Sequence, residues 1–442
     1  MAASIFGSSY LSGLFDTGEV GRLFSDSAEI RALLLTEGAL AKVQGALGVI
    51  PEISAKAIHR ASLEIQLDPA DLREATRQNG VVIPGLVAGF RGEMQAPEHA
   101  QYIHWGATSQ DIIDTALMLR LRQVLGQNET TIKSILSKMV AIADRHSATP
   151  MVARTWGQHA TPTTWGGVMA QWGNPLVDAL NALENLRNTS LWISLSGASG
   201  TGSALGPKAA ETRAALAEAL GLIDPMRSWH TDRSPILGIA SWHVRVSAIL
   251  AGLGKSLSAL AVTEAAEIQL GGAGSSSTMP QKQNPVGPAA LIALHGYASG
   301  GLSSLHAAAS QEHQRDGAAW MIEWAVLPQI ILSVSSALET ARKTIETLEP
   351  NEGRMLSALT GGTGLAQAEA LSFALAEHMS RPDAQAATKA IIAKVSDQGG
   401  TLKSVAQSEF PALSDDVFDP VNHVGTAPQD ARNFVQRVHR MP

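Results

Sequence analysis

The 442-residue sequence contains no cysteine. This absence excludes disulfide bridges, thiolate metal sites and cysteine nucleophiles, but it does not identify a cellular compartment. The sequence also lacks any run of lysines and arginines, and its net charge is −7. Nucleic acid is therefore not expected as a partner.

Metal-binding and membrane patterns are missing as well. The 13 histidines form no HxxxH or HExxH spacing, so we expect no metal and no cofactor. The N-terminus has no cationic segment followed by an apolar run, so no secretory signal is predicted. The most apolar stretch, residues 246–262, carries Lys255 near its middle, which favours a buried helix over a membrane span. A cytoplasmic protein with no membrane partner is the expectation.

Helical patterns dominate, and convincing strands are nearly absent. In residues 27–51, apolar side chains recur at three- and four-residue intervals, which predicts an amphipathic helix. We expect Ser27 to cap its N-terminus, Glu29 and Glu37 to lie on its polar face, and Pro51 to end it.

Two proline-free windows, between Pro235 and Pro280 and between Pro288 and Pro328, predict helices on the order of 40–50 Å long. Their apolar residues lie on more than one face, so they need partners all round, as in a bundle. Shorter helices are expected from about residue 350. We therefore predict an all-α protein with three helical domains: residues 1–103, a central long-helix bundle over 104–347, and residues 348–442.

The segment GGAGSSSTMPQKQNP, residues 271–285, is the densest candidate for chemistry. Its backbone amides and hydroxyls, together with Lys282 and Asn284, could hold an anion. The alternative is a flexible linker between helices, which is what most Gly/Ser-rich segments are. The spacing does not match a P-loop, so nucleotide phosphate is not implied.

This segment resembles the signature GSSxMPxKxNP of the fumarase/aspartase superfamily. Ser275 stands where the pattern has glycine. The matching positions are Ser276, Ser277, Met279, Pro280, Lys282, Asn284 and Pro285. Two more blocks of the superfamily follow the expected order, HWGATSQDIIDTA at 104–116 and RTWGQHATPTTWG at 154–166. Within the superfamily, the sequence is most similar to the bacterial 3-carboxymuconate cycloisomerases, also over QEHQRDGAAWMIEW at 311–324.

The resemblance implies roles for these residues. Ser276 would exchange the proton at the carbon beside a substrate carboxylate, with Lys282 as the second catalytic group of the loop. Lys282, Asn284 and the loop amides would hold that carboxylate, and Ser277 is a further substrate-binding candidate. A second carboxylate would be bound by Thr108, Ser109 and Gln158.

The sequence departs from the superfamily at one pair of residues. Most members have a general acid/base histidine where this chain has Trp156, and a glutamate that pairs with it where this chain has Ala289. General acid catalysis accelerates the loss of a basic leaving group by roughly 10²–10⁴-fold. A carboxylate, whose ordinary pKa is about 4, attacks or leaves without that help. The absence of both the histidine and the glutamate therefore favours an intramolecular carboxylate addition, with Trp156 as an apolar wall against the substrate.

Three further residues are candidates for the site. His159 could orient a substrate carboxylate, act as a substitute acid/base, or merely cap the following helix; we count it among the catalytic candidates. His104 is predicted to contact substrate. Arg315 suits bidentate binding of a third carboxylate, with a solvated interhelical pair as the alternative. Arg154 is a further cation available to a polyanion.

The function implied by the resemblance is a cofactor-independent cyclisation of 3-carboxy-cis,cis-muconate in the breakdown of aromatic compounds. The partner would be a small anionic polycarboxylate, and the enzyme a homotetramer whose active sites are shared between subunits. Three alternatives stay open: an adenylosuccinate-type lyase, a cycloisomerase for a related muconate such as a sulfomuconate, and a non-catalytic, crystallin-like member.

Overall fold

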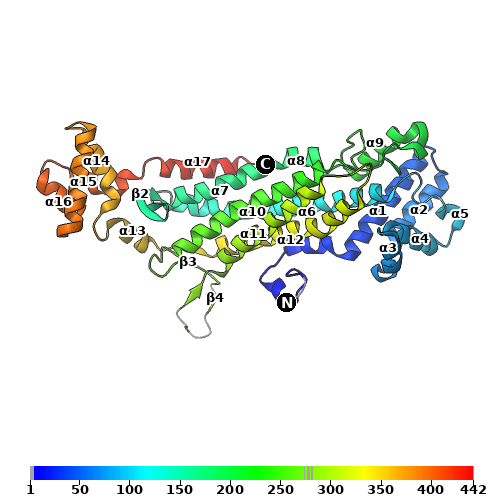
Figure 1. Cartoon of the computed structure of the whole chain (residues 1–442), viewed down its shortest axis with the longest axis horizontal. Coiled ribbons are helices and arrows are strands. Elements are labelled where there is room, and N and C mark those ends of the chain that lie inside the picture. The colour runs from blue at the N-terminus through cyan, green and yellow to red at the C-terminus, as the bar shows by residue number, and fades with distance from the viewer. Residues whose placement is uncertain (1–3, 273, 276–278, 280–281, 442) are drawn as a thin grey trace. The chain divides into compact units, whose positions relative to one another are not determined.

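The computed structural model describes residues 4–272, 274–275, 279 and 282–441 (Figure 1). These residues form seventeen α-helices and six short β-strands, so the expected all-α class is confirmed. The helices are α1 (Asp26–Ala46), α2 (Glu52–Glu64), α3 (Arg73–Asn79), α4 (Ile83–Met94), α5 (Pro97–Ala100), α6 (Ser109–Arg145), α7 (Trp165–Asn181), α8 (Leu183–Ser190), α9 (Ala209–Leu220), α10 (Ser234–Leu260), α11 (Val286–Ala308), α12 (Gly317–Glu346), α13 (Glu352–Thr360), α14 (Ala368–Ala376), α15 (Arg381–Gln398), α16 (Leu402–Glu409) and α17 (Ala427–His439). The strands are β1 (Pro150–Thr155), β2 (Gln158–Thr164), β3 (Ile268–Leu270), β4 (Gly274–Ser275), β5 (Gln283–Asn284) and β6 (Leu348–Pro350).

The N-cap of helix α1 lies two residues before the expected one. Ser25 has an extended backbone, and its hydroxyl accepts a hydrogen bond from the amide of Ala28, as an N-cap serine does. Ser27 lies inside the helix, so its prediction as the cap is wrong. The helix ends at Ala46, and Pro51 instead precedes the first residue of α2.

The first proline-free window holds one long helix and the second does not. Helix α10 spans 27 residues, about 40 Å at 1.5 Å per residue. The second window is broken between Ala308 and Gly317, where α11 ends and α12 begins. Helix α12 continues through Pro328, whose missing amide hydrogen removes one helical hydrogen bond.

Helices α10 and α12 are long and apolar enough to cross a membrane, judged by length and composition alone. In each, 61% of the most apolar window is buried within the protein, as in the core helix of a packed bundle.

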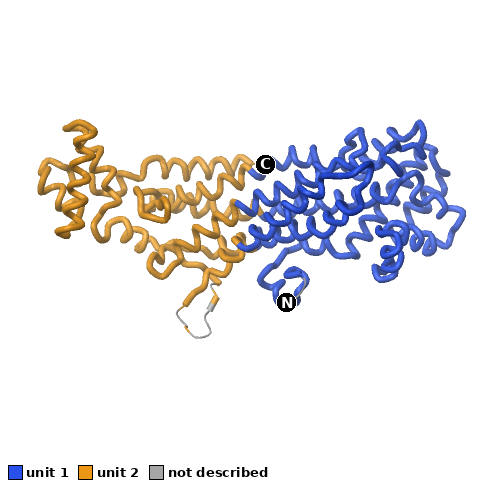
Figure 2. The backbone as a smooth tube through the Cα atoms, in the orientation of Figure 1, with its two compact units in different colours: residues 1–131, 179–248, 293–339 blue, residues 132–178, 249–292, 340–442 orange. Residues whose placement is uncertain are grey.

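The chain divides into two compact units (Figure 2). Unit 1 comprises residues 1–131, 179–248 and 293–339, and unit 2 comprises residues 132–178, 249–292 and 340–442. The three-domain division expected from the sequence stays a prediction.

Two parts of these units matter for the candidate site. In unit 1, α1 packs against α2, and the segment between α5 and α6 carries the HWGATSQD block. In unit 2, β1 and β2 form an antiparallel hairpin that carries the RTWGQHATPTTWG block. Helices α14 to α16 of unit 2 enclose a small core of their own, made of Leu371, Leu375, Ala384, Ile391, Leu402 and Ala406.

Candidate active site

The buried carboxylate of Asp111 organises the HWGATSQD block in unit 1. Five donors converge on it at 2.8–3.0 Å: the amides of Thr108, Ser196 and Gly197, the hydroxyl of Ser194, and Nε2 of His230. Burial works to raise the pKa of Asp111, but the hydrogen bond and charge of His230, with the backbone amides, outweigh it and lower the pKa. An ionised Asp111 thus joins the start of α6 to the 194–197 segment.

Arg315 is hydrogen-bonded to the residues at the start of α6. Its Nε donates to the side-chain oxygen of Gln110 at 2.9 Å. One terminal nitrogen donates to the hydroxyl of Thr108 at 3.2 Å and to the carbonyl of Ala198 at 3.1 Å. Among the described residues no carboxylate pairs with this exposed guanidinium, so its charge is available to an anion.

A buried ion triad is connected to Arg315 through Gln110. The guanidinium of Arg233 binds the carboxylates of Asp114 and Glu323 with two hydrogen bonds each, at 2.7–3.1 Å. All three side chains are at most 4% exposed. Burial disfavours the charged guanidinium, but the two carboxylates outweigh this and raise the pKa of Arg233. Gln110 connects the triad to Arg315, because its amide donates to Asp114 at 3.2 Å.

His104 lies in the segment between α5 and α6 and pairs with a glutamate of α1. Its Nδ1 is 2.7 Å from Oε1 of Glu37, which is 1% exposed. The expectation that Glu37 lies on the polar face of its helix is therefore wrong. Helix α1 is buried on more than one face, so its polar residue finds a partner inside the protein.

The β1–β2 hairpin of unit 2 presents three of the predicted residues. Trp156 and Gly157 are its two loop residues, with φ of 55° and 76°, which is the pattern of a type I′ turn. Trp156 is fully exposed, and Gln158 and His159 follow it as exposed residues of β2. Arg154 on β1 is bound bidentately by Glu267 at 2.8 Å, so its charge is already matched within unit 2.

Lys282 and Asn284 line a cavity of about 410 Å³ in unit 2. Its other described walls come from the end of α10, the segment to β3, and Asn351, and no carboxylate side chain is among them. Ala289, where the superfamily has glutamate, is exposed in the first turn of α11. Ser276 and Ser277 lie outside the described residues.

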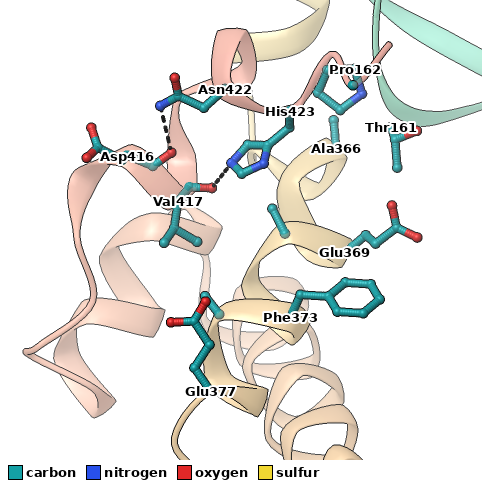
Figure 3. A pocket seen from close by; sticks show the side chains of 13 residues that line it. Thr161, Pro162, Ala366, Glu369, Phe373, Glu377, Asp416, Val417, Asn422 and His423 are labelled. Atoms are coloured by element: carbon teal, nitrogen blue, oxygen red, sulfur yellow. Dashed lines mark hydrogen bonds between the residues drawn. The ribbon is translucent and has the colours of Figure 1, made fainter.

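A second cavity, of about 650 Å³, has the opposite character (Figure 3). It lies in unit 2 between β2, α14 and the 416–425 segment, and none of the predicted site residues lines it. Glu369, Glu377 and Asp416 contribute three carboxylates to its wall, with no lysine or arginine. His423 is tied back to the carbonyl of Val417 at 3.0 Å. Such a wall repels a polycarboxylate, so size alone does not mark the active site.

Comparison with known proteins decides the family. A family model described as lyase matches residues 22–300, which is more than half of the chain. The chain belongs to this lyase family.

Individual relatives match nearly the whole length of the chain. A protein of Pseudomonas aeruginosa named 3-carboxy-cis,cis-muconate cycloisomerase is 36% identical over 94% of this chain and 92% of its own. The crystal structure of the 3-carboxy-cis,cis-muconate lactonizing enzyme from Pseudomonas putida matches with a TM-score of 0.92 and 34% identity, over 98% of this chain and 99% of its own. An N-acetyl-S-(2-succino)cysteine lyase of Dickeya dadantii is 30% identical over 96% of this chain and 95% of its own. The resemblance to the fumarase/aspartase superfamily, and within it to the muconate cycloisomerases, is thereby confirmed.

Unit 1 brings together His104, Thr108, Ser109 and Arg315, whereas Trp156, Gln158 and His159 share the hairpin of unit 2. Sequence reasoning missed the groups that hold the unit 1 cluster in place. These are Glu37, Gln110, Asp111, Asp114, His230, Arg233 and Glu323. The acidic pair at 111 and 114 was visible as an i, i+3 repeat inside a recognised block, but its partners are distant in sequence. The substrate-contact roles of the predicted residues stay predictions.

Proposed function

We propose that this protein is a cofactor-independent cycloisomerase that converts 3-carboxy-cis,cis-muconate to 4-carboxymuconolactone. The observation that supports it most is the near full-length similarity to proteins with that name at 36–38% identity. The place of the reaction in aromatic breakdown and a cytoplasmic location are part of the proposal.

The reaction adds a carboxylate across an alkene within one molecule. An oxygen of one terminal carboxylate forms a bond to an alkene carbon, and the electron pair of that double bond moves to the adjacent carbon. There it is delocalised into the other terminal carboxylate as an enediolate. One proton then adds to that carbon, so a trianion becomes a dianionic lactone. The barrier lies in the extra negative charge of the enediolate, which cations and N–H donors stabilise best in a site without water.

The cavity beside the signature loop suits that charge. Lys282 supplies a cation and Asn284 an amide, and no carboxylate on the described walls competes with them. In the proposal Ser276 donates the proton to the carbanion, and Ser277 contributes to holding the carboxylate. This demand on a serine is mild, because the neutral hydroxyl is the form that donates.

In the proposal the other predicted residues bind the remaining carboxylates of the trianion. Arg315 and the Thr108–Ser109 turn offer one unpaired cation and two hydroxyls in unit 1. Gln158, His159 and the Trp156 wall lie on the hairpin of unit 2. We propose that the protein is a homotetramer in which blocks from different subunits complete each site.

The test is turnover of the purified protein on a panel of substrates. Loss of the muconate absorbance with formation of the lactone is expected. Adenylosuccinate, and N-acetyl-S-(2-succino)cysteine as the substrate named for the Dickeya relative, serve as competitors. Release of fumarate from either of these without any loss of the muconate chromophore would contradict the proposal. A 3-sulfomuconate in the same panel separates the carboxylate and sulfonate alternatives.

A further inference from the structure

Glu37 and His104 form a buried carboxylate–imidazole pair that no predicted role uses. Oε1 of Glu37 lies 2.7 Å from Nδ1 of His104. The side chain of His104 is 20% exposed, whereas that of Glu37 is fully buried. No described residue is hydrogen-bonded to Nε2 of His104, so this atom is the end of the pair that can meet a ligand.

The turn that carries His104 is held by two hydrogen bonds to its backbone carbonyls. Gln44, seven residues after Glu37 on α1, donates to the carbonyl of Trp105 at 2.7 Å. Arg91 on α4 donates to the carbonyl of Ile103 at 3.0 Å. His104 itself has φ of 66°, a left-handed conformation that a non-glycine residue keeps only where its surroundings enforce it. Its ring is therefore held in one orientation.

Electrostatics favour the charged form of this ring. Burial is the largest influence on His104 and works to lower its pKa. The charge and hydrogen bond of Glu37 oppose it, Asp111 on α6 adds to them, and Arg91 on α4 works against them. The net effect raises the pKa of His104 above its ordinary value. The nearby charges of α1, α4 and α6 thus favour an imidazolium, in which Nε2 carries a hydrogen and can donate it.

We propose that Glu37 is a positioning residue that holds His104 as an imidazolium, whose Nε2–H binds a carboxylate of the substrate. The inference rests on the proposed function for the identity of that substrate. It adds a retained proton to the substrate contact predicted for His104, and it assigns Glu37 a role that acts only through His104.

The pair also bears on the departure at positions 156 and 289. The superfamily's histidine and glutamate are replaced there by Trp156 and Ala289, which carry no charge. A trianionic substrate still needs cations around it, and Arg154 is occupied by Glu267. The Glu37–His104 pair supplies a cation from another part of the chain, and it needs no proton transfer during the reaction.

The test is the binding of tricarballylate, a tricarboxylate without a double bond, measured by calorimetry in two buffers of different ionisation enthalpy. The pKa of His104 is raised in the wild type, so at about pH 7.5 its ring takes up less proton on binding than it does without Glu37. In Glu37→Gln, the ring must gain a proton on binding. We expect uptake approaching one proton per site, about tenfold weaker binding at pH 7.5, and recovery towards wild-type affinity near pH 5.5.

Three variants keep the test independent of folding. Glu29→Gln, on the same helix and paired with Arg120, should bind like the wild type. Glu37→Asp keeps a carboxylate and should retain part of the affinity if Glu37→Gln does not fold. In a His104→Gln background, Glu37→Gln should have no further effect on affinity or proton uptake.

Unchanged affinity and proton uptake in Glu37→Gln would overturn the inference, as would failure of the wild type to bind tricarballylate. Muconate turnover is measured separately. If the wild type does not cyclise the muconate but tricarballylate binding shows the expected proton linkage, the proposed function fails and the role of Glu37 stands.

Discussion

The side-chain oxygen of Gln110 accepts a 2.9 Å hydrogen bond from Nε of Arg315. The amide nitrogen of the same residue donates to Asp114 at 3.2 Å and to the carbonyl of His230 at 2.9 Å. These two buried acceptors fix the amide so that its oxygen faces Arg315. An exposed arginine has many rotamers of similar energy, so an anchor of this kind reduces the entropy lost when it binds an anion.

Gln110→Leu should therefore weaken substrate binding through Arg315. We expect KM for the muconate to rise about tenfold with a smaller change in kcat, because one hydrogen bond to a charged group contributes about 1.5–3 kcal/mol. Steady-state kinetics check this. Gln78→Leu, at an exposed glutamine bonded to Glu74, is the matched control and should leave KM unchanged. A normal KM in Gln110→Leu would contradict the anchoring role.

Arg233→Met should strongly destabilise unit 1. It leaves the buried carboxylates of Asp114 and Glu323 without their cation, which costs about 3–5 kcal/mol in the free energy of unfolding. Burial already raises the pKa of Glu323 despite Arg233, so the variant should recover part of its stability as the pH falls and Glu323 gains a proton. Urea titrations at two pH values measure both effects.

Arg227→Met is the control for this substitution. Arg227 pairs with Asp232 at 2.5 Å, but its side chain is 55% exposed, so we expect a loss of less than about 1 kcal/mol. An equal loss in both variants would show that the burial of the triad has no special effect.

The fold class could be predicted, and candidate site residues could be named, because both depend on local patterns. The helical periodicity and the three short motifs lie within continuous stretches of sequence, and their residues could be named without knowing any long-range contact. The cap at Ser25 was missed because Ser25 and Ser27 are equally suited by residue type, and only the backbone distinguishes them. The break between α11 and α12 was missed because a turn needs no proline.

The residues that support the site could not be found in this way. Glu37 looks like a solvent-exposed helix residue until a histidine 67 positions away is placed against it. Arg233 reaches Asp114 and Glu323 across 119 and 90 residues. Pairings at such separations depend on which helix faces meet, and one sequence does not determine that.

His243 predicts a loss of stability in acid. It lies on α10 and is buried. Its Nδ1 donates to the carbonyl of Ile239, and its Nε2 accepts from Asn128 of α6. Burial lowers its pKa to about 4, despite the opposing hydrogen bond to Ile239. The neutral ring contributes stability above the unfolded-state pKa of about 6.5, and this is lost as the pH falls towards 4. The contribution is on the order of 3 kcal/mol.

The measurement is the free energy of unfolding at several pH values between 6.5 and 4. His243→Gln can make the same two hydrogen bonds but does not titrate there. We expect the slope of its stability against pH to be smaller than that of the wild type by up to one proton per chain. Equal slopes would place the acid sensitivity at other groups.

Lys282→Met should reduce kcat/KM by about 10²-fold, since it removes the cation of the signature-loop cavity where the enediolate charge develops. Lys282→Arg keeps the charge with a different shape and should retain part of the activity. Lys56→Met, at an exposed lysine paired with Glu52, should have no effect. Stopped assays on the muconate check all three. Full activity in Lys282→Met would show that this cavity is not where the enediolate charge is stabilised.

Ser276→Ala tests the proton donor of the same loop. If the serine hydroxyl protonates the carbanion, turnover should fall by about 10²-fold or more while tricarballylate still binds. Ser275→Ala, at the position where the superfamily pattern has glycine, is the control. Undiminished muconate turnover in Ser276→Ala would show that another group donates the proton.

Trp156→Asn should raise stability and lower activity together. A tryptophan at φ of 55° carries a backbone cost of about 1–2 kcal/mol, and its exposed side chain regains little of this within its own chain. Asn-Gly is a preferred pair for a type I′ turn, so the substitution should stabilise the hairpin by about 1 kcal/mol. Gly157→Ala should do the reverse: its added methyl group would contact nothing within 4 Å, so only the strain at φ of 76° acts.

A residue kept at a strained position for its side chain has a function there, and the wall role predicts that kcat/KM falls in Trp156→Asn although the protein becomes more stable. Thermal unfolding and muconate kinetics on the same samples measure the two effects, and a variant that is both more stable and fully active would remove Trp156 from the site.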